Sequence, residues 1–170
     1  MESVLVTGGA GYIGSHVVAV LAGLGQRCVC VDNFSNSSRE SVTRVRRIST
    51  GEIALYEADI RDTVALRAIL AKEGCTSVIH MAGLKAVGES VEFPERYHDN
   101  NVRGTKCLLE ALRDSPVRRF VFSSSATVYG IPERVPLEET AATSPQSPYG
   151  ENKLEIEGLL TRLAADDPSW

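Results

Sequence analysis

A doubly wound parallel α/β sheet with helices on both faces is the fold that this sequence of 170 residues predicts. Two observations indicate it. Five short apolar runs alternate along the chain with five longer stretches of helical periodicity, and no repeat, low-complexity tract or linker interrupts the alternation. A chain of this length can bury a substantial core, so we expect one domain over residues 1–170.

Each expected strand is a run of β-branched or aromatic residues, and turn residues bound most of them. These runs are residues 3–7, 27–32, 53–59, 77–83 and 118–125. The expected helices are residues 12–24, 38–49, 62–73, 94–114 and 148–165. Asp62 can cap the third helix, and Pro94 and Pro148 occupy positions typical of a first helical turn. Residues 126–147 hold three prolines and predict an irregular segment after the fifth strand, where open α/β sheets place ligand-binding loops.

The composition argues against several classes of function. A net charge of −4, with 43% hydrophobic and 24% charged residues, does not favour binding to nucleic acid or to an anionic membrane. No apolar run approaches the ~18 residues of a membrane span. The first residues, MESVLV, carry an acid and lead directly into a strand, so we expect a cytoplasmic protein. The four cysteines and three histidines show no ligand spacing, so we expect buried free thiols and no metal site.

The strongest local motif is the glycine-rich stretch VLVTGGAGYIGSH. Gly9, Gly11 and Gly14 have G-x-G-x-x-G spacing directly after the first strand, and Gly8 adds an overlapping pattern. Glycines at these positions permit a tight turn, a close approach of the backbone to a pyrophosphate, and packing of the helix near the strand. Asp32 ends the second strand, where a carboxylate accepts a hydrogen bond from a ribose 2′-hydroxyl and repels a 2′-phosphate. The pattern predicts a dinucleotide site that prefers NAD to NADP.

The stretch SPYGENK places Tyr149 and Lys153 one helical turn apart on a common face. Ser147 and Pro148 before them are also typical of an ordinary helix start. Taken alone, the stretch therefore leaves two interpretations open: a proton-transfer pair, or the first turn of a surface helix.

The motifs together carry a family resemblance. The chain contains TGGAGYIGSH, VDNFSNSS, VIHMAGLKAVGESV, NNVRGT, FSSSATVYG and PQSPYGENK. It closely resembles the extended short-chain dehydrogenase/reductase family, and within it the UDP-hexose 4-epimerases, over essentially all its residues. The resemblance implies a Rossmann-type fold and the interconversion of UDP-glucose and UDP-galactose through a 4-keto sugar, with NAD as cofactor and a UDP-sugar as substrate.

The resemblance also implies the roles of individual residues. Tyr149 would be the catalytic base, Lys153 its electrostatic partner, and Ser125 the hydroxyl that bonds the sugar O4. Ionisation near pH 7 requires the pKa of a tyrosine to fall by about three from its usual value near 10. We expect Lys153, at about 5 Å, and the positive nicotinamide to supply that shift.

A larger set of residues is expected, by the same resemblance, to contact NAD, and Lys85, Ser125 and Tyr149 are expected to contact the substrate. The expected NAD contacts are Gly8, Gly11, Tyr12, Ile13, Gly14, Asp32, Asn33, Asn36, Ser37, Asp59, Ile60, Met81, Ala82, Gly83, Lys85, Asn100, Ser123, Tyr149 and Lys153.

A related activity is disfavoured by the sequence itself. Sugar-nucleotide 4,6-dehydratases of the same superfamily need an acid–base pair of carboxylates directly after the serine or threonine. Those two positions are Ala126 and Thr127 here, and neither can serve.

The resemblance ends before the sixth strand of the family, so a substrate domain and most of the UDP-sugar pocket would lie beyond Trp170. Two hypotheses of different class follow: the N-terminal portion of an epimerase, or an NAD-binding module without turnover of its own. By resemblance, the complete protein is expected to be a homodimer formed through the helices near 94–114 and 148–165.

Overall fold

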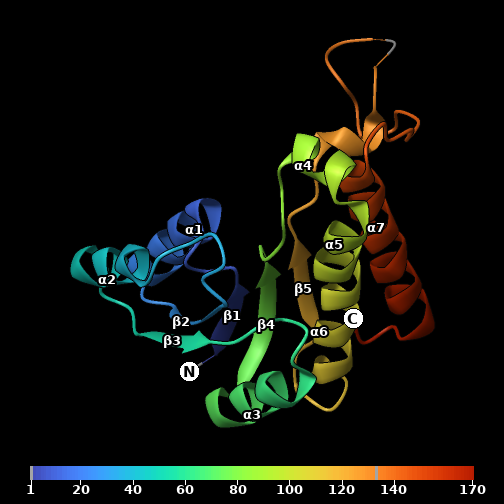
Figure 1. The fold of residues 1–170 in the computed structure, drawn as a ribbon. Coiled ribbons are helices and arrows are strands. Elements are labelled where there is room, and N and C mark those ends of the chain that lie inside the picture. Colours follow the sequence, from blue (N-terminus) through green and yellow to red (C-terminus); the bar gives the residue numbers. More distant parts are fainter. Residues whose placement is uncertain (1, 133) are drawn as a thin grey trace. The chain divides into compact units, whose positions relative to one another are not determined.

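The computed structural model describes residues 2–132 and 134–170, and it contains a parallel sheet of five strands (Figure 1). The strands are β1 (Ser3–Thr7), β2 (Arg27–Asp32), β3 (Ile53–Glu57), β4 (Cys75–His80) and β5 (Arg119–Phe122). Their order is β3-β2-β1-β4-β5, and all the pairs are parallel. The order runs outward from β1 in both directions, as it does in a doubly wound sheet, whose ligands bind beyond the carboxyl ends of the strands.

The helices follow the strands in sequence. They are α1 (Tyr12–Gly23), α2 (Arg39–Ile48), α3 (Thr63–Glu73), α4 (Val87–Glu92), α5 (Pro94–His98), the π-helix η1 (Asp99–Arg103), α6 (Gly104–Leu112), the 3₁₀-helix η2 (Ala126–Tyr129) and α7 (Pro148–Asp166). As predicted, the Asp62 side chain caps α3, accepting a hydrogen bond of 2.9 Å from the Ala65 N–H.

The strands near the centre are buried on both faces. Every residue of β1 is buried, and successive side chains of a strand point to opposite faces of the sheet. Val4 and Val6 pack with residues of α1 and α2, including Val18 and Val42, so Leu5 faces the other side. Helices therefore cover both faces, and the predicted fold class is confirmed.

The cysteines behave as small core residues. Cys28, Cys30 and Cys75 are buried and all four thiols are free, as the sequence predicts. Burial raises the pKa of Cys28 and Cys75 to about 11 and that of Cys30 to about 12. At neutral pH these three are unreactive thiols.

The described chain divides into two compact units. The first, here called the sheet unit, extends to Ala82 and includes Lys106–Ser123. The second, the helical unit, comprises Gly83–Thr105 and Ser124–Trp170. The sheet, α1, α2 and α3 belong to the sheet unit, while α4, α5, η1, η2 and α7 belong to the helical unit, in which α7 contacts the other four elements. The single domain over residues 1–170 stays a prediction.

The helix expected over 94–114 is present as an unbroken helical run from Pro94 to Leu112, but its middle is a π turn that was not predicted. The structure has α5, the π-turn η1 and α6 there, and adds α4, which was not predicted. Asn101 explains the wide turn. Its side chain exchanges two hydrogen bonds with the backbone of Leu84, at 2.8 and 2.9 Å, and its carbonyl accepts from the Thr105 hydroxyl. Packing on another segment thus overrides a regular helix.

The third, fourth and fifth strands end earlier than predicted. The predicted ends were residues 59, 83 and 125, whereas β3, β4 and β5 end at Glu57, His80 and Phe122. Pairing continues for one residue past each of these ends. The Ala58 N–H donates to Asp32, the Met81 N–H to Thr7 and the Ser123 N–H to His80. The residues that follow leave the sheet and form the loops at its carboxyl edge.

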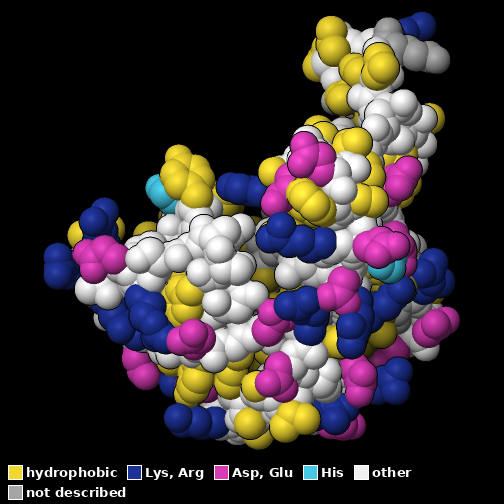
Figure 2. All heavy atoms as spheres, viewed as in Figure 1, with side chains coloured by type: hydrophobic (Ala, Val, Ile, Leu, Met, Phe, Trp, Pro, Cys, Tyr) yellow, Lys and Arg dark blue, Asp and Glu magenta, His cyan; other side chains and the backbone are white. Residues whose placement is uncertain are grey.

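The surface carries both signs of charge, interspersed over the face that Figure 2 shows. Hydrophobic side chains gather on the protruding loop after η2, where Ile131, Val135 and Leu137 are exposed. Among residues 2–132 and 134–170, no helix combines the length and apolar character that crossing a membrane requires. The same residues contain no group of three or more His, Cys, Asp or Glu side chains placed to hold a metal ion.

Candidate functional site

The glycine loop joins β1 to α1 at the carboxyl edge of the sheet. Gly8 has a φ of +68°, and a Cβ there would lie 2.7 Å from the Ala82 nitrogen. A Cβ on Gly14 would lie 2.1 Å from the Gly8 carbonyl oxygen. Both positions therefore exclude any side chain, and the loop lies directly against the start of α1 and the end of β4. This close backbone turn fits the predicted cradle for a pyrophosphate.

The N-terminus of α1 is open to an anion. Its N-cap residue is Gly11, so no side chain caps the helix, and no acid occupies its first turn. Tyr12 and Ile13 point outward, with exposed fractions of 76% and 52%. The N–H groups of a first helical turn carry partial positive charge and favour phosphate.

Asp32 ties the glycine loop to the loop that follows β2. It is buried, and its two carboxylate oxygens accept hydrogen bonds from the Ala10 N–H (3.0 Å), the Phe34 N–H (2.9 Å) and the Ser37 hydroxyl (2.7 Å). Its position at the end of β2 agrees with the prediction. These contacts add a structural role that the sequence did not indicate.

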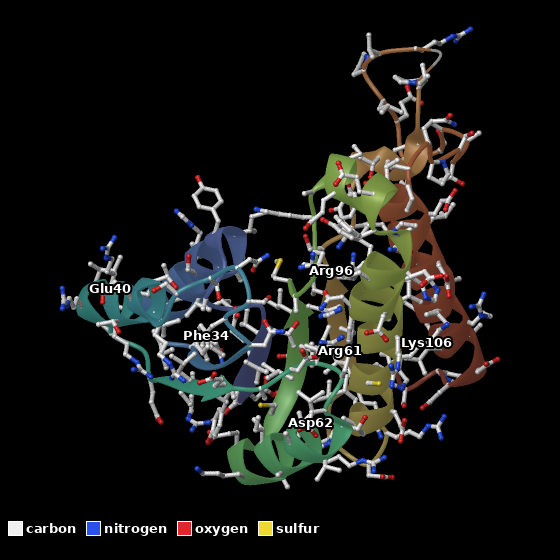
Figure 3. All side chains as sticks on the ribbon, in the orientation of Figure 1. Phe34, Glu40, Arg61, Asp62, Arg96 and Lys106 are labelled. Atoms are coloured by element: carbon white, nitrogen blue, oxygen red, sulfur yellow. The ribbon has the colours of Figure 1, made fainter. Side chains whose placement is uncertain are left out.

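A second polar cluster lies at the ends of β2 and β3. The Asn33 amide donates to Asp59 at 2.9 Å, and Arg61 donates to both oxygens of the same carboxylate. These bonds, chiefly those from Arg61, hold the pKa of Asp59 well below its usual range. Arg61 lies in the segment that leads into α3 (Figure 3). Ile60 is buried, whereas Asn36 is exposed and lies outside these contacts.

Thr7 and His80 hold the loop after β4, and neither was predicted. The Thr7 hydroxyl and His80 Nδ1 are 2.6 Å apart, and the Ala82 N–H donates to the same hydroxyl at 3.4 Å. Both side chains are buried. A polar residue within an apolar strand was the available signal, because such a group requires a partner when it is buried.

In the helical unit, Asn101 fixes the segment that follows Gly83. It holds Leu84 by the two hydrogen bonds described above, and the neighbouring Lys85 is exposed. The predicted contact residue Asn100 is half-buried. Only Asn100 was predicted from the sequence, and the residue that shapes this segment is its neighbour Asn101.

Tyr149 and Lys153 lie on α7, which begins as predicted. Ser147 accepts from the Gly150 N–H at 3.2 Å, and Pro148 occupies the first turn. Both functional side chains are buried, with exposed fractions of 9% and 7%. The Lys153 Nζ lies 5.6 Å from the centroid of the Tyr149 ring. A solvent-exposed helix start would not bury this pair.

Two further residues hold the start of α7. The Ser90 hydroxyl, fully buried on α4, accepts from the Tyr149 N–H at 3.2 Å. A Cβ on Gly150 would lie 2.9 Å from the Thr127 carbonyl oxygen, so only glycine permits this approach of α7 to η2. Neither Ser90 nor Gly150 was among the predicted site residues.

Without a cofactor, the pKa of Tyr149 is raised, whereas the sequence predicts that Lys153 and the nicotinamide together lower it. Burial raises the pKa of Tyr149, and a hydrogen bond with Ser125 only partly opposes that effect. Burial also lowers the pKa of Lys153 to about 8, while the negative charge of Glu157 acts in the opposite direction. Glu157 lies one turn beyond Lys153 and accepts a hydrogen bond from the Ser124 hydroxyl. Lys153 is thus mostly protonated at pH 7, but its charge does not overcome the desolvation of the phenol.

The predicted site residues fall into groups within each unit. In the sheet unit, Gly8 meets Ala82, Asp32 meets Ser37, and Asn33 meets Asp59. Met81 and Ser123 follow β4 and β5 in the same unit. In the helical unit, Tyr149 lies beside both Ser125 and Lys153.

Comparison with known proteins agrees with this geometry. The model of the NAD dependent epimerase/dehydratase family matches residues 4–168. The chain is 49% identical to a UDP-glucose 4-epimerase of Dictyostelium discoideum, over 99% of this chain and 49% of that protein. It is 47% identical to a UDP-glucose 4-epimerase of Bacillus subtilis, over 99% of this chain and 50% of that protein.

Solved structures give the same result. The UDP-glucose 4-epimerase from Bifidobacterium longum in complex with NAD⁺ and UDP superposes with a TM-score of 0.96 at 42% identity, covering 99% of this chain and 51% of that one. An epimerase from Stenotrophomonas maltophila with bound NAD and formylated UDP-arabinopyranose gives a TM-score of 0.94 at 45% identity, covering 98% of this chain and 49% of that one. The chain thus spans about half the length of the relatives that it matches.

Proposed function

Because the chain belongs to the NAD dependent epimerase/dehydratase family, we propose that it is the NAD-binding portion of a UDP-hexose 4-epimerase that interconverts UDP-glucose and UDP-galactose. The observation that carries this proposal is that the buried Tyr149 and Lys153 lie together with the half-buried Ser125 in the helical unit. A buried phenol beside a buried ammonium and a hydroxyl is suited to moving a proton on a bound alcohol.

The sheet unit supplies groups suited to NAD. Gly8 and Gly14 exclude side chains where a pyrophosphate would approach, and α1 offers an uncapped N-terminus. Asp32, at the end of β2, would accept a hydrogen bond from an adenosine ribose. NAD would supply a hydride acceptor and donor for the sugar C4. The expected cofactor contacts named from the sequence remain part of this proposal.

The residues of the helical unit would move and stabilise the proton. Tyr149, as the phenolate, takes the proton of the sugar 4-hydroxyl as C4 is oxidised, and returns it to O4 when the 4-keto sugar is reduced from its other face. Ser125 donates a hydrogen bond to O4. Lys153, charged at neutral pH, stabilises the phenolate and contacts the nicotinamide ribose. Because the chain alone raises the pKa of Tyr149, the phenolate needs positive charge beyond that of Lys153.

Dehydration of the sugar is a poor alternative for this site. Elimination requires proton transfer at C5 and C6 by groups that follow Ser125 directly. Ala126 has no titratable group, and the Thr127 hydroxyl donates to Ser125 at 2.9 Å.

A second candidate is an NAD-binding module without turnover of its own. The coverage of only half of each relative favours it, because binding of the remote part of a substrate positions the reacting carbon. Calorimetric titration with NAD, together with an epimerase assay on the 170-residue chain, separates the two candidates. Saturable NAD binding with no interconversion would support the module.

The activity itself is tested in the full-length protein encoded by the reading frame that contains this chain. Interconversion of UDP-glucose and UDP-galactose without net NADH release is expected. Tyr149→Phe should lower turnover by roughly 10²–10⁴ and leave NAD bound. Tyr129→Phe, which removes a phenol on η2, is the matched control and should retain turnover. Mass-spectrometric detection of a 4-keto-6-deoxy sugar, or more than a tenth of activity in Tyr149→Phe, would contradict the assignment.

The complete protein is also expected to form a homodimer through the region of α5, α6 and α7. In the helical unit, Val91 and Phe93 next to α5 are exposed by 62% and 50%, which is the kind of apolar surface that a partner would cover. Light scattering on the full-length protein tests the stoichiometry, and a monomer at micromolar concentration would contradict it.

A further inference from the structure

The Ser125 hydroxyl has both of its acceptor positions occupied by one residue. The Thr127 N–H donates to Ser125 Oγ at 3.2 Å, and the Thr127 hydroxyl donates to the same oxygen at 2.9 Å. A hydroxyl offers two lone pairs and one proton. With both lone pairs engaged, the proton of Ser125 is what remains for a further hydrogen bond.

That proton determines which side chain is the donor in the hydrogen bond between Ser125 and Tyr149. A hydrogen bond from the Ser125 side chain lowers the pKa of Tyr149, against the larger effect of burial. Since Ser125 has only its proton left, it donates and the phenol oxygen accepts. Donation to a phenol oxygen stabilises the phenolate over the neutral phenol. When a sugar is bound, the same proton can be donated to its O4 in place of the phenol oxygen.

We propose that Thr127 is a positioning residue that fixes the Ser125 hydroxyl as a hydrogen-bond donor, toward Tyr149 in the absence of substrate and toward the sugar O4 when substrate is bound. The inference rests on the proposed function, and it assigns to Thr127 a part in the same proton transfer. In the sequence analysis, Thr127 is notable only because a dehydratase would have a carboxylate at this position, and the inference assigns it a role of its own.

The surroundings of Thr127 hold it in place for this role. The Val128 N–H donates to the Ser125 carbonyl at 3.2 Å, and the Gly130 N–H donates to the Thr127 carbonyl at 3.3 Å. The Ser144 N–H bonds to the Val128 carbonyl at 2.9 Å and joins the two ends of the intervening loop. From the other side, Gly150 of α7 lies against the Thr127 carbonyl.

Other titratable groups near the start of α7 are already engaged or exposed. Lys153 faces the Tyr149 ring from the same helix, and Tyr97 packs against Tyr149 from α5. On the elements packed against α7, Glu89 accepts hydrogen bonds from Tyr97 and Arg96. His98 pairs with Glu155, and Arg103 pairs with Asp99. The other titratable groups there are Tyr129 on η2 and the exposed Glu92 and Glu95. Thr127 takes part in none of these contacts.

The test compares Thr127→Val with Thr127→Ser in the full-length, NAD-loaded protein. Valine keeps the shape and the backbone N–H but removes the hydroxyl donor, while serine restores it. The readouts are turnover against pH and the ultraviolet absorbance of the Tyr149 phenolate, isolated by subtraction of the Tyr149→Phe spectrum. Thr161→Val, an exposed threonine on α7, is the matched control.

Thr127→Val is expected to lower kcat about three- to tenfold and to raise the midpoint of phenolate formation by about half a pH unit, the scale of one neutral hydrogen bond. Thr127→Ser and Thr161→Val should leave both values unchanged. A Thr127→Val variant with a normal phenolate midpoint and a normal pH profile overturns the inference, even if its melting temperature falls. Full activity in Tyr149→Phe would instead overturn the proposed function.

Discussion

At the scale of the residue, the pair Tyr149 and Lys153 shows what a sequence can and cannot predict. Their spacing placed them correctly on one face of a helix. The pKa shift of Tyr149 was not predictable, because Leu84, Ser90 and Tyr97, which contact this residue, are distant from it in the sequence. Likewise, the structural contacts of Asp32 depend on Ala10 and Ser37, which only the folded loops bring together.

The burial of Lys153 has a measurable cost in stability. Burial lowers its pKa from 10.5 to about 8, so below pH 8 the folded state holds a charge that the unfolded state hydrates better. Between about pH 8 and 10.5 the unfolded state binds more protons, so stability rises with pH and the penalty disappears. The full penalty is roughly 3 kcal/mol.

We therefore expect Lys153→Met to stabilise the cofactor-free chain at pH 7, by up to roughly 3 kcal/mol, and to have little effect at pH 10.5. Urea unfolding at the two pH values measures the difference. Lys85→Met, which removes an exposed charge from the same unit, should change stability by less than about 0.5 kcal/mol. If Lys153→Met instead destabilised the chain at pH 7, Lys153 would have a structural role, and the prediction that it lowers stability would be wrong.

At the scale of the element, prediction succeeded where capping and periodicity agreed. Each end of α1, α2, α3 and α7 lies within one residue of the predicted one, and Asp62 and Ser147 cap as expected. Prediction failed for α4 and η1. The helix α4 has only six residues. The π turn η1 depends on the hydrogen bonds between Asn101 and Leu84, which no local sequence pattern encodes.

The start of α7 gives a prediction at this scale. Gly150→Ala should gain about 1 kcal/mol in helix propensity but place a Cβ 2.9 Å from the Thr127 carbonyl and 3.0 Å from the Pro145 Cβ. We expect a net loss of roughly 1–3 kcal/mol and a fall in turnover, because α7 must move away from η2.

Gly158→Ala is the matched control on the same helix. Its Cβ would meet only the Arg162 side chain, at 3.5 Å, so it should stabilise the protein by about 0.5–1 kcal/mol. Thermal melts and steady-state rates of both variants test the contrast. Equal stabilisation by the two alanines would mean that α7 does not need its close approach to η2.

At the scale of the whole molecule, the alternation of runs was enough to predict a parallel sheet covered on both faces. The order β3-β2-β1-β4-β5 was not predictable from spacing alone, since it depends on which strands pair. Nor does the sequence indicate the division into a sheet unit and a helical unit, because no linker marks it and Lys106–Ser123 returns to the first unit.

Cofactor choice can be measured on the molecule as a whole. A ligand that binds only the folded state stabilises it by about 2.7 kcal/mol at 100 times its Kd. For a protein of this size that is a rise of roughly 5–10 °C in melting temperature. NAD should produce this rise, and NADP at the same concentration a smaller one, because its 2′-phosphate would meet the Asp32 carboxylate.

Asp32→Ala should narrow the difference between the two cofactors. It should also lower the melting temperature without cofactor, because Ala10, Phe34 and Ser37 lose their common acceptor. Asp62→Ala, which removes a carboxylate that caps α3, controls for a general loss of stability. Calorimetric titration of the unmodified chain should give NAD a Kd at least about tenfold lower than that of NADP, a difference of about 1.4 kcal/mol. Equal affinities would mean that Asp32 serves only to join the glycine loop to the loop after β2.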